Sequence, residues 1–192
     1  IGTRGARKIR AERESTTRGL VFGQIGLSPN TDKRKQLSNQ EYLVMSPAVR
    51  IGLIGYGEVG KIFSAGLLKQ PGVAGVSAWD LKFARTDTAA AERQHAAQAG
   101  VQAQDSAAAL CAANDLVIAA VTASSTLAVA EEAARHLRPG SLYLDLNSAS
   151  PGTKRQCAQL IDGAGAHYVE AGGVTSVPPY GILVPMLLGG GR

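Results

Sequence analysis

The stretch Ile51–Phe63, IGLIGYGEVGKIF, places three glycines within six positions, between an apolar run and a segment with helical periodicity. Gly55, Gly57 and Gly60 form a GxGxxG pattern that follows a predicted strand and opens a predicted helix, which is the setting of a dinucleotide-binding loop. There the first glycine permits a tight turn, the second lets the backbone approach a phosphate, and the third lets the helix pack on the sheet. An ordinary glycine turn is the alternative. The predicted cofactor contacts in this loop are Gly55, Tyr56, Gly57, Glu58, Val59 and Gly60.

From residue 45 onward, apolar runs alternate with helical segments. The predicted strands are 49–55, 73–80, 101–103, 115–121, 141–147, 167–170 and 182–188, and the predicted helices are 58–70, 88–99, 106–113, 127–137 and 151–162. Strands that are apolar on both faces are typical of a parallel sheet covered by helices on both sides. We therefore expect an α/β, Rossmann-type, doubly wound and mostly parallel sheet with helices on both faces.

The positive charge lies at the start of the chain. Residues 1–44 carry nine Lys or Arg and four acidic residues, whereas residues 45–192 carry eleven of each, so the net charge of +5 belongs to the first segment. Its polar composition without periodicity predicts a disordered basic tail, residues 1–46, before a domain at 47–192. Met45 is the expected natural start, with upstream or artificially added sequence before it. A targeting segment and a nucleic-acid-binding arm are the alternatives, and we expect no nucleic-acid partner.

The composition excludes several classes of protein. Two cysteines, Cys111 and Cys157, stand far apart without a CxxC pair or a Cys/His cluster, so we expect two reduced core residues and no metal site. The lack of a disulfide framework points to the cytoplasm. No apolar run approaches the roughly 18 residues that a membrane span requires, so we expect no membrane partner.

Two further segments should border the cofactor. Asp80 stands at the end of the second predicted strand, where an acidic side chain can accept hydrogen bonds from the adenosine ribose and favour NAD. Lys82 and Arg85 follow, and they could instead clamp the 2′-phosphate of NADP, so the sequence favours NAD only slightly. The loop after the fourth major strand, 120–126, should border the same ligand, because ligands sit beyond the carboxyl ends of parallel strands. The predicted contacts are Asp80, Leu81, Lys82, Val121, Thr122 and Ala123.

Two later motifs carry a resemblance to a known family. The segment 145–154, DLNSASPGTK, resembles the D-x-[ST/N]-[ST]-x-x-P stretch of the β-hydroxyacid dehydrogenases, which include 3-hydroxyisobutyrate, tartronate semialdehyde and 6-phosphogluconate dehydrogenases. The segment VPPYG at 177–181 and the segment VPMLLGG at 184–190 resemble a less characterised branch of bacterial NAD(P)-dependent oxidoreductases. The likeness covers roughly residues 48–192. It implies a hydride transfer between nicotinamide and a small hydroxy acid.

The resemblance also implies where the substrate binds. Asn147, Ser148 and Ala149 would line its pocket, and Gly172 and Gly173 correspond to a glycine-containing substrate loop. The family's catalytic lysine lies in a second, all-helical domain, so we expect it beyond Arg192 and expect no catalytic residue in this chain. That helical domain would also supply much of a homodimer interface.

The remaining basic groups suggest no catalytic base. Lys61 and Lys154 do not match the family's lysine, and Lys154 is predicted to be a solvated helix residue. The three histidines, at 95, 136 and 167, have no paired acid at a useful spacing and are predicted to be structural. A non-catalytic dinucleotide-binding module and an imine reductase-like enzyme are the alternative functions. Without a second domain, the apolar stretch 182–188 should be exposed and promote self-association.

Overall fold

The computed structural model describes residues 48–173 and 175–190, so the predicted tail at 1–46 lies outside the described residues. The strands are β1 (Val49–Ile54), β2 (Val73–Trp79), β3 (Gln102–Ala103), β4 (Leu116–Ala119), β5 (Leu142–Asp145), β6 (His167–Gly173) and β7 (Met186–Gly189). The helices are α2 (Glu58–Leu67), α3 (Ala89–Gln98), α4 (Ala107–Ala113), α5 (Thr126–Ala134), α6 (Pro151–Gly163) and α7 (Val177–Tyr180), with 3-10 turns at Leu81–Phe83, Ala123–Ser125 and Gly181–Leu183.

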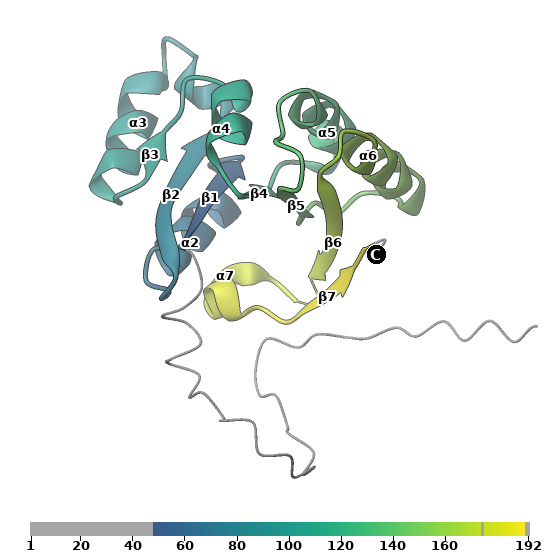
Figure 1. Cartoon of the computed structure of the whole chain (residues 1–192). Coiled ribbons are helices and arrows are strands. Elements are labelled where there is room, and N and C mark those ends of the chain that lie inside the picture. The colour runs from purple at the N-terminus through teal and green to yellow at the C-terminus, as the bar shows by residue number, and fades with distance from the viewer. Residues whose placement is uncertain (1–47, 174, 191–192) are drawn as a thin grey trace, which may run out of the picture.

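All seven strands form one twisted sheet (Figure 1). The strand order is β3-β2-β1-β4-β5-β6-β7, and every neighbouring pair is parallel except β6 and β7, which are antiparallel. The chain builds outward from β1 in one direction through β2 and β3, and then in the other direction from β4. The order therefore reverses between β1 and β4, and such a switch point is where open α/β sheets bind ligands.

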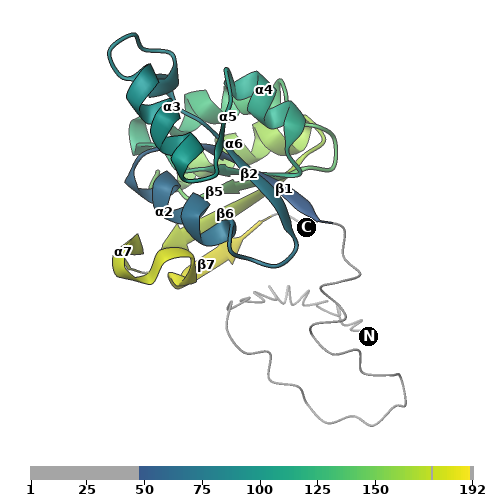
Figure 2. The same cartoon turned by 90° about the vertical axis from the view of Figure 1, so that its left-hand side faces the viewer.

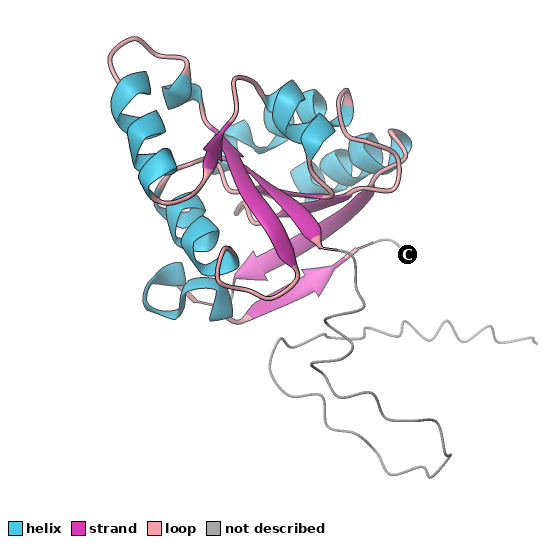
Figure 3. Ribbon diagram, turned by 60° about the vertical axis from the view of Figure 1, so that its left-hand side comes forward, coloured by secondary structure: helices cyan, strands magenta, loops and turns pink. Residues whose placement is uncertain are grey.

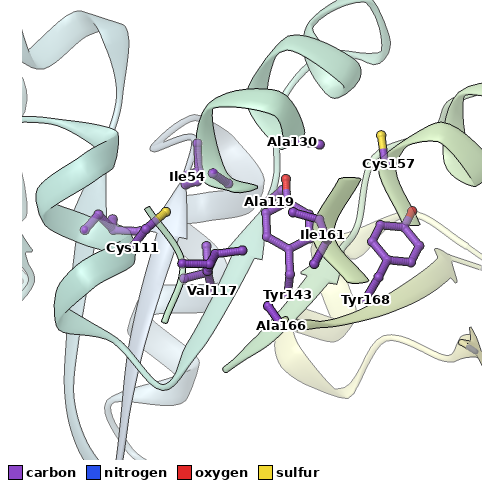
Figure 4. Packing of buried hydrophobic residues seen from close by; sticks show 13 residues of the cluster. Ile54, Cys111, Val117, Ala119, Ala130, Tyr143, Cys157, Ile161, Ala166 and Tyr168 are labelled. Carbon is purple, nitrogen blue, oxygen red and sulfur yellow. The ribbon is translucent and has the colours of Figure 1, made fainter. Parts of the chain in front are cut away.

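Two hydrophobic layers hold the helices to the sheet. On one face, side chains from β4, β5 and β6 pack under α4, α5 and α6, and on the other face Ile51, Leu53 and Val76 pack under α2 and α3. Figures 2 and 3 show helices on both sides of the strands. Figure 4 shows the first layer, in which Cys111 and Cys157 are buried as free thiols, as the sequence predicted.

The predicted fold class is confirmed, and every predicted helix and strand has a counterpart. Serine side chains cap two of these helices, because Ser106 and Ser150 each accept a hydrogen bond from the backbone amide three residues later, at α4 and α6. Pro151 occupies the first turn of α6, where its missing amide costs nothing.

The prediction of one strand over 182–188 is wrong in its first half. Gly181–Leu183 is a 3-10 turn, and β7 begins only at Met186, after Pro185. The short helix α7, over Val177–Tyr180, was not predicted either. The reason is the same in both places: three prolines in nine residues restrict φ and remove amides, so this apolar segment bends back over α2 before it can pair with β6.

Candidate functional site: a cleft at the switch point

A cleft of about 780 Å³ opens at the carboxyl ends of β1, β2 and β4. Of the twelve predicted cofactor residues, nine line it: Gly55, Gly57, Glu58, Val59, Asp80, Leu81, Lys82, Val121 and Thr122. Tyr56, Gly60 and Ala123 do not. Tyr56 is buried, with its ring against Phe83 and His95, and only its backbone belongs to the loop.

The three glycines of the loop meet three different constraints. Gly55 has a φ of +101°, and a Cβ there would lie 2.3 Å from the carbonyl oxygen of Ala120. A Cβ on Gly60 would lie 2.1 Å from the carbonyl oxygen of Gly55, so only glycine lets α2 approach β1 so closely. A Cβ on Gly57 would meet nothing within 4 Å, and Gly57 lines the cleft. The backbone at Gly57 is therefore open to a group bound in the cleft.

The N-terminus of α2 faces this open position. Gly57 is the N-cap, its carbonyl accepts the Lys61 amide at 2.9 Å, and no side chain of the described residues caps the helix. Backbone amides at an uncapped helix N-terminus donate to anions, and the helix dipole adds to the attraction. The residues present thus fit the pyrophosphate of a dinucleotide.

Asp80 fastens the glycine loop to the end of β2. Its Oδ2 accepts a hydrogen bond from the Tyr56 amide at 2.7 Å, and its Oδ1 accepts one from the Lys82 amide at 2.9 Å. A carboxylate has about four acceptor positions, so each oxygen can still accept from a ribose hydroxyl. Asp80, which is predicted to bind the ribose, therefore also holds the glycine loop in place.

The two basic residues beside Asp80 are compensated by acids. Arg85 donates to Asp87 through Nε at 3.1 Å and through Nη2 at 2.8 Å. The Nζ of Lys82 lies 3.8 Å from Glu92, which also binds the Nζ of Lys61 at 2.8 Å. The hydrogen bond from Lys61 holds the pKa of the Glu92 carboxyl group below its usual range. Among the described residues, the positive charges at this corner of the cleft are therefore matched by acidic partners.

The predicted substrate residues lie beside the cleft, along the same edge of the sheet. Asp145 pairs with Glu170 between β5 and β6, so Asn147 and Gly172 both stand two residues past that pair. Ser148 and Gly173 are exposed, and Ala149 is half-buried. Asn147 is 4% exposed, and its Oδ1 accepts the Val121 amide at 2.6 Å. Of these residues, Asn147 is hydrogen-bonded directly to the cleft lining.

The prediction that Lys154 is solvated is wrong. The side chain is 5% exposed, and its Nζ lies 3.1 Å from Oδ1 of Asp145, which is completely buried. The reason is the face of α6 on which it stands, because Lys154 shares a helical stripe with Cys157 and Ile161, which are also buried. The spacing of those apolar residues was the signal that could have placed Lys154 inside.

The histidine prediction is wrong in one respect. His136 does have an acidic partner one helical turn earlier, because its Nε2 lies 3.2 Å from Oε1 of Glu132, which lines the cleft. His95 instead pairs with the Tyr56 hydroxyl at 3.2 Å, and His167 is exposed at the start of β6.

Several lining residues were missed by the sequence analysis. They come mainly from the far wall of the cleft, made by α4 and α5, and include Trp79, Ala107, Ala128, Val129 and Glu132, whereas Ser124 and Ser125 belong to the loop 120–126 that was predicted to border the ligand. The i, i+4 spacing of Ala128 and Glu132 puts them on one face of α5, but nothing in the sequence tells which face meets the cleft. In residues 48–173 and 175–190, no helix is long and apolar enough to cross a membrane, and no cluster of three metal-ligating side chains occurs.

Solved structures show the same architecture. A conserved hypothetical protein from Sinorhizobium meliloti 1021 is 35% identical with a TM-score of 0.70, and the match covers 74% of this chain and 47% of that one. The 3-hydroxyisobutyrate dehydrogenase of Mycobacterium tuberculosis, solved with L-serine, is 25% identical with a TM-score of 0.63, covering 75% and 47%. An imine reductase from Aspergillus terreus, solved with NADPH4 and dibenz[c,e]azepine, shares the fold at 21% identity and a TM-score of 0.52, covering 68% and 43%.

This chain therefore spans about half the length of these solved proteins. Among curated proteins, no sequence matches it significantly. The family described as the NAD binding domain of 6-phosphogluconate dehydrogenase matches residues 50–177, which confirms the predicted resemblance and the predicted cofactor class, NAD or NADP. With its glycine loop, switch-point cleft and strand order, the chain belongs to the family of the NAD binding domain of 6-phosphogluconate dehydrogenase.

Proposed function

We propose that this chain is the cofactor-binding part of an oxidoreductase that moves hydride between a nicotinamide and a small hydroxy acid. The observation that carries the proposal is the open backbone at Gly57, below the uncapped N-terminus of α2 and inside a cleft of about 780 Å³. A bound dinucleotide would supply the hydride acceptor. Gly55, Gly57, Glu58 and Val59 would hold its pyrophosphate through backbone amides, and Asp80 would hold the adenosine ribose.

The substrate would bind along the edge of the sheet next to the nicotinamide. Asn147, Ser148 and Ala149 offer amide and hydroxyl groups there, and Gly172 and Gly173 let a ligand approach the backbone of β6. Lys154 is committed to Asp145 and is not available to accept the hydroxyl proton. The proposal assigns that proton to a lysine outside the described residues. A cytoplasmic location and a homodimer stay predictions.

Within this proposal, NAD is the preferred cofactor. Asp80 presents a carboxylate to the cleft, while Arg85 is paired with Asp87 and Lys82 faces Glu92. A 2′-phosphate would meet the Asp80 charge, and in residues 48–173 and 175–190 the two neighbouring cations, Lys82 and Arg85, are already paired with acids. A ribose hydroxyl would instead donate to that carboxylate.

Trp79, the one tryptophan of the sequence, lines the cleft and reports on binding. The test is a titration with NADH and then NADPH, following Trp79 quenching and energy transfer to the nicotinamide. Saturable binding, tighter for NADH, is expected. No saturable binding of either cofactor by the folded protein would refute the proposal.

Two glycine variants make the titration specific. Gly57→Ala puts a methyl group into the space left for the phosphate and should weaken NADH binding by about tenfold or more, a loss of about 1.4 kcal/mol. Gly75→Ala is the matched control, since a Cβ on this β2 residue also meets nothing within 4 Å but Gly75 is not part of the cleft lining. Equal affinities for the two variants would argue against the glycine loop as the phosphate site.

The reaction itself needs a separate assay. Because the proposal places the proton-accepting lysine outside the described residues, the chain is assayed joined to a helical domain that supplies this lysine. Reduction of NAD by a series of small hydroxy acids, read as NADH absorbance, should then reveal the substrate class. Tight cofactor binding without turnover of any hydroxy acid would favour the alternative of a non-catalytic dinucleotide-binding module. Oxidation of NADH by a cyclic imine instead would favour an imine reductase-like activity.

A further inference from the structure

A fully buried carboxylate lies directly beneath the predicted substrate loop. Asp145, the last residue of β5, has no exposed surface. Its Oδ1 is 3.1 Å from Nζ of Lys154, and its Oδ2 accepts the Tyr168 hydroxyl at 2.7 Å. Lys154 comes from α6 and Tyr168 from β6, so side chains from two neighbouring elements fix one carboxylate.

The same carboxylate reaches the cofactor cleft through Asn147. The Asn147 amide donates to Oδ1 of Asp145 at 2.9 Å, and the side-chain Oδ1 of Asn147 accepts the amide of Val121 at 2.6 Å. Val121 lines the cleft at the end of β4. A continuous chain of polar contacts therefore runs from Lys154 and Tyr168 through Asp145 and Asn147 to the cleft wall.

Stability alone gives little reason for this arrangement. Burying two charges costs several kcal/mol of desolvation, and well-packed apolar residues of similar volume often stabilise a fold equally well or better. The Nδ2 of Asn147 is also buried without a hydrogen-bond partner among the described residues, which is a further cost. Such a network is better explained by the groups that it orients, which are the Asn147 side chain and the backbone at Val121. The buried Nδ2 of Asn147 is a hydrogen-bond donor that could bind an acceptor atom of a ligand.

We propose that Asp145, Lys154 and Tyr168 are positioning residues that fix the loop after β5 and, through Asn147, hold the end of β4 in its ligand-binding geometry. The inference rests on the proposed function, because it takes the ends of β4 and β5 to border the nicotinamide and the substrate. It predicts that breaking the network weakens the nicotinamide contacts and leaves the adenosine and pyrophosphate contacts intact.

Two tyrosines on neighbouring strands offer a matched pair of variants. Tyr143 on β5 and Tyr168 on β6 are register partners with stacked rings 6.2 Å apart, and both are buried (Figure 4). The Tyr168 hydroxyl binds Asp145, whereas the Tyr143 hydroxyl has no hydrogen-bond partner in the described part of the chain. Tyr168→Phe therefore removes a hydroxyl that binds Asp145. Tyr143→Phe removes an equivalent hydroxyl that makes no contact with the network.

The probes are NADH and ADP-ribose, which differ by the nicotinamide. For the unaltered chain, NADH is expected to bind more tightly than ADP-ribose. Tyr168→Phe should reduce that ratio of affinities by about fivefold to tenfold, through weaker NADH binding at unchanged ADP-ribose binding, which is the size of effect expected for losing one hydrogen bond. Tyr143→Phe should leave both affinities unchanged. A merely structural role of Tyr168 would weaken both ligands together or neither.

A double variant keeps the inference testable if a single charge removal unfolds the protein. Lys154→Met alone leaves the buried Asp145 carboxylate without its ion-pair partner. Asp145→Asn combined with Lys154→Met removes both charges at nearly constant side-chain volume. The double variant should fold, bind ADP-ribose normally and lose part of the NADH affinity. Exchange of the Val121 amide with solvent deuterium should also become faster, while the Leu53 amide in β1 stays protected.

The outcomes separate this inference from the proposed function. If the unaltered chain binds neither NADH nor ADP-ribose, the proposed function fails and the inference fails with it. Two outcomes would overturn the inference alone. In the first, both ligands bind, but Tyr168→Phe and the double variant keep the NADH to ADP-ribose affinity ratio of the unaltered chain. In the second, the unaltered chain binds NADH and ADP-ribose equally tightly.

Discussion

Gly57 and Gly60 stand three residues apart in one loop, but the structure constrains them in opposite ways. A Cβ on Gly60 would lie 2.1 Å from the carbonyl oxygen of Gly55. Because this oxygen belongs to the backbone, it cannot move away as a flexible side chain could. Gly60→Ala should therefore lower the free energy of unfolding by about 1–3 kcal/mol, as overpacking does. Gly57→Ala should stay within about 0.5 kcal/mol of the unaltered chain, because its Cβ meets open space.

Urea unfolding of the two variants, followed by circular dichroism, checks this contrast. Equal unfolding midpoints for Gly60→Ala and Gly57→Ala would show that the close approach of α2 to β1 is not a real constraint.

The two thiols are predicted to be inert in the native protein. Burial raises the pKa of the Cys111 thiol to about 12, and burial also raises the pKa of the Cys157 thiol. Since the thiolate is the reactive form, neither cysteine should react with iodoacetamide at about pH 8. Mass spectrometry should find no label on the native chain and two labels in denaturant. Rapid labelling of one native cysteine would mean that α4 or α6 opens from the core.

At the scale of elements, one cluster of ion pairs joins β1 and β4 at the amino ends of the strands, opposite the cleft at their carboxyl ends. Asp115, just before β4, accepts the Arg50 amide at 2.9 Å and the Arg50 guanidinium at 3.2 Å, and it also pairs with Arg138. These hydrogen bonds, led by the one from the Arg50 side chain, hold the pKa of the Asp115 carboxyl group well below its ordinary range. The contribution to stability is therefore complete above the ordinary pKa of about 3.9 and is lost as the pH falls toward the lowered value.

Asp115→Asn should consequently destabilise the chain at neutral pH and matter less in acid. After allowance for solvent screening, since Asp115 is 38% exposed, the loss should be about 1 kcal/mol at pH 7. The difference between the variant and the unaltered chain should shrink below about pH 4 in urea titrations. Asp87→Asn, which breaks an exposed local pair with Arg85, is the control that should change little at any pH. A pH-independent loss for Asp115→Asn would contradict the ion-pair explanation.

The elements also show what the sequence alone could predict. Apolar runs marked β1, β2, β4, β5 and β6, because the pattern that predicts a strand is local. The glycine loop and Asp80 were predictable for the same reason. The buried position of Lys154 and the cleft wall from α5 were not, because they depend on which helix face meets the sheet and on partners far along the chain. Prolines in the last segment broke a pattern that apolar content alone had suggested.

At the scale of the whole molecule, the segment 180–187, which runs from α7 through a 3-10 turn into β7, exposes large apolar side chains among the described residues. Leu183 is 74% exposed, Leu187 is 71% exposed, and Tyr180 is 52% exposed. Leu187 lies on β7, which is the last strand in the sheet order and so presents unpaired backbone groups as well. An exposed edge strand with large apolar side chains promotes association between chains. The predicted exposure of 182–188 is therefore seen at Leu183 and Leu187 but is wrong for Val184, which is buried in the core, and self-association remains the expected consequence.

Replacing the two leucines should reduce that association. Leu187→Thr keeps the β-propensity of β7, and Leu183→Ser changes the 3-10 turn before it. Together they remove the two most exposed leucines of this segment, so light scattering should show a smaller mass at equal concentration. Leu160→Ser is the control, because Leu160 is 36% exposed on α6 and stands apart from this edge. If the control and the double variant lower the scattering equally, general surface hydrophobicity would explain the association. If only the double variant does so, and NADH affinity is unchanged, the segment 183–187 is the contact surface and is independent of the cofactor cleft.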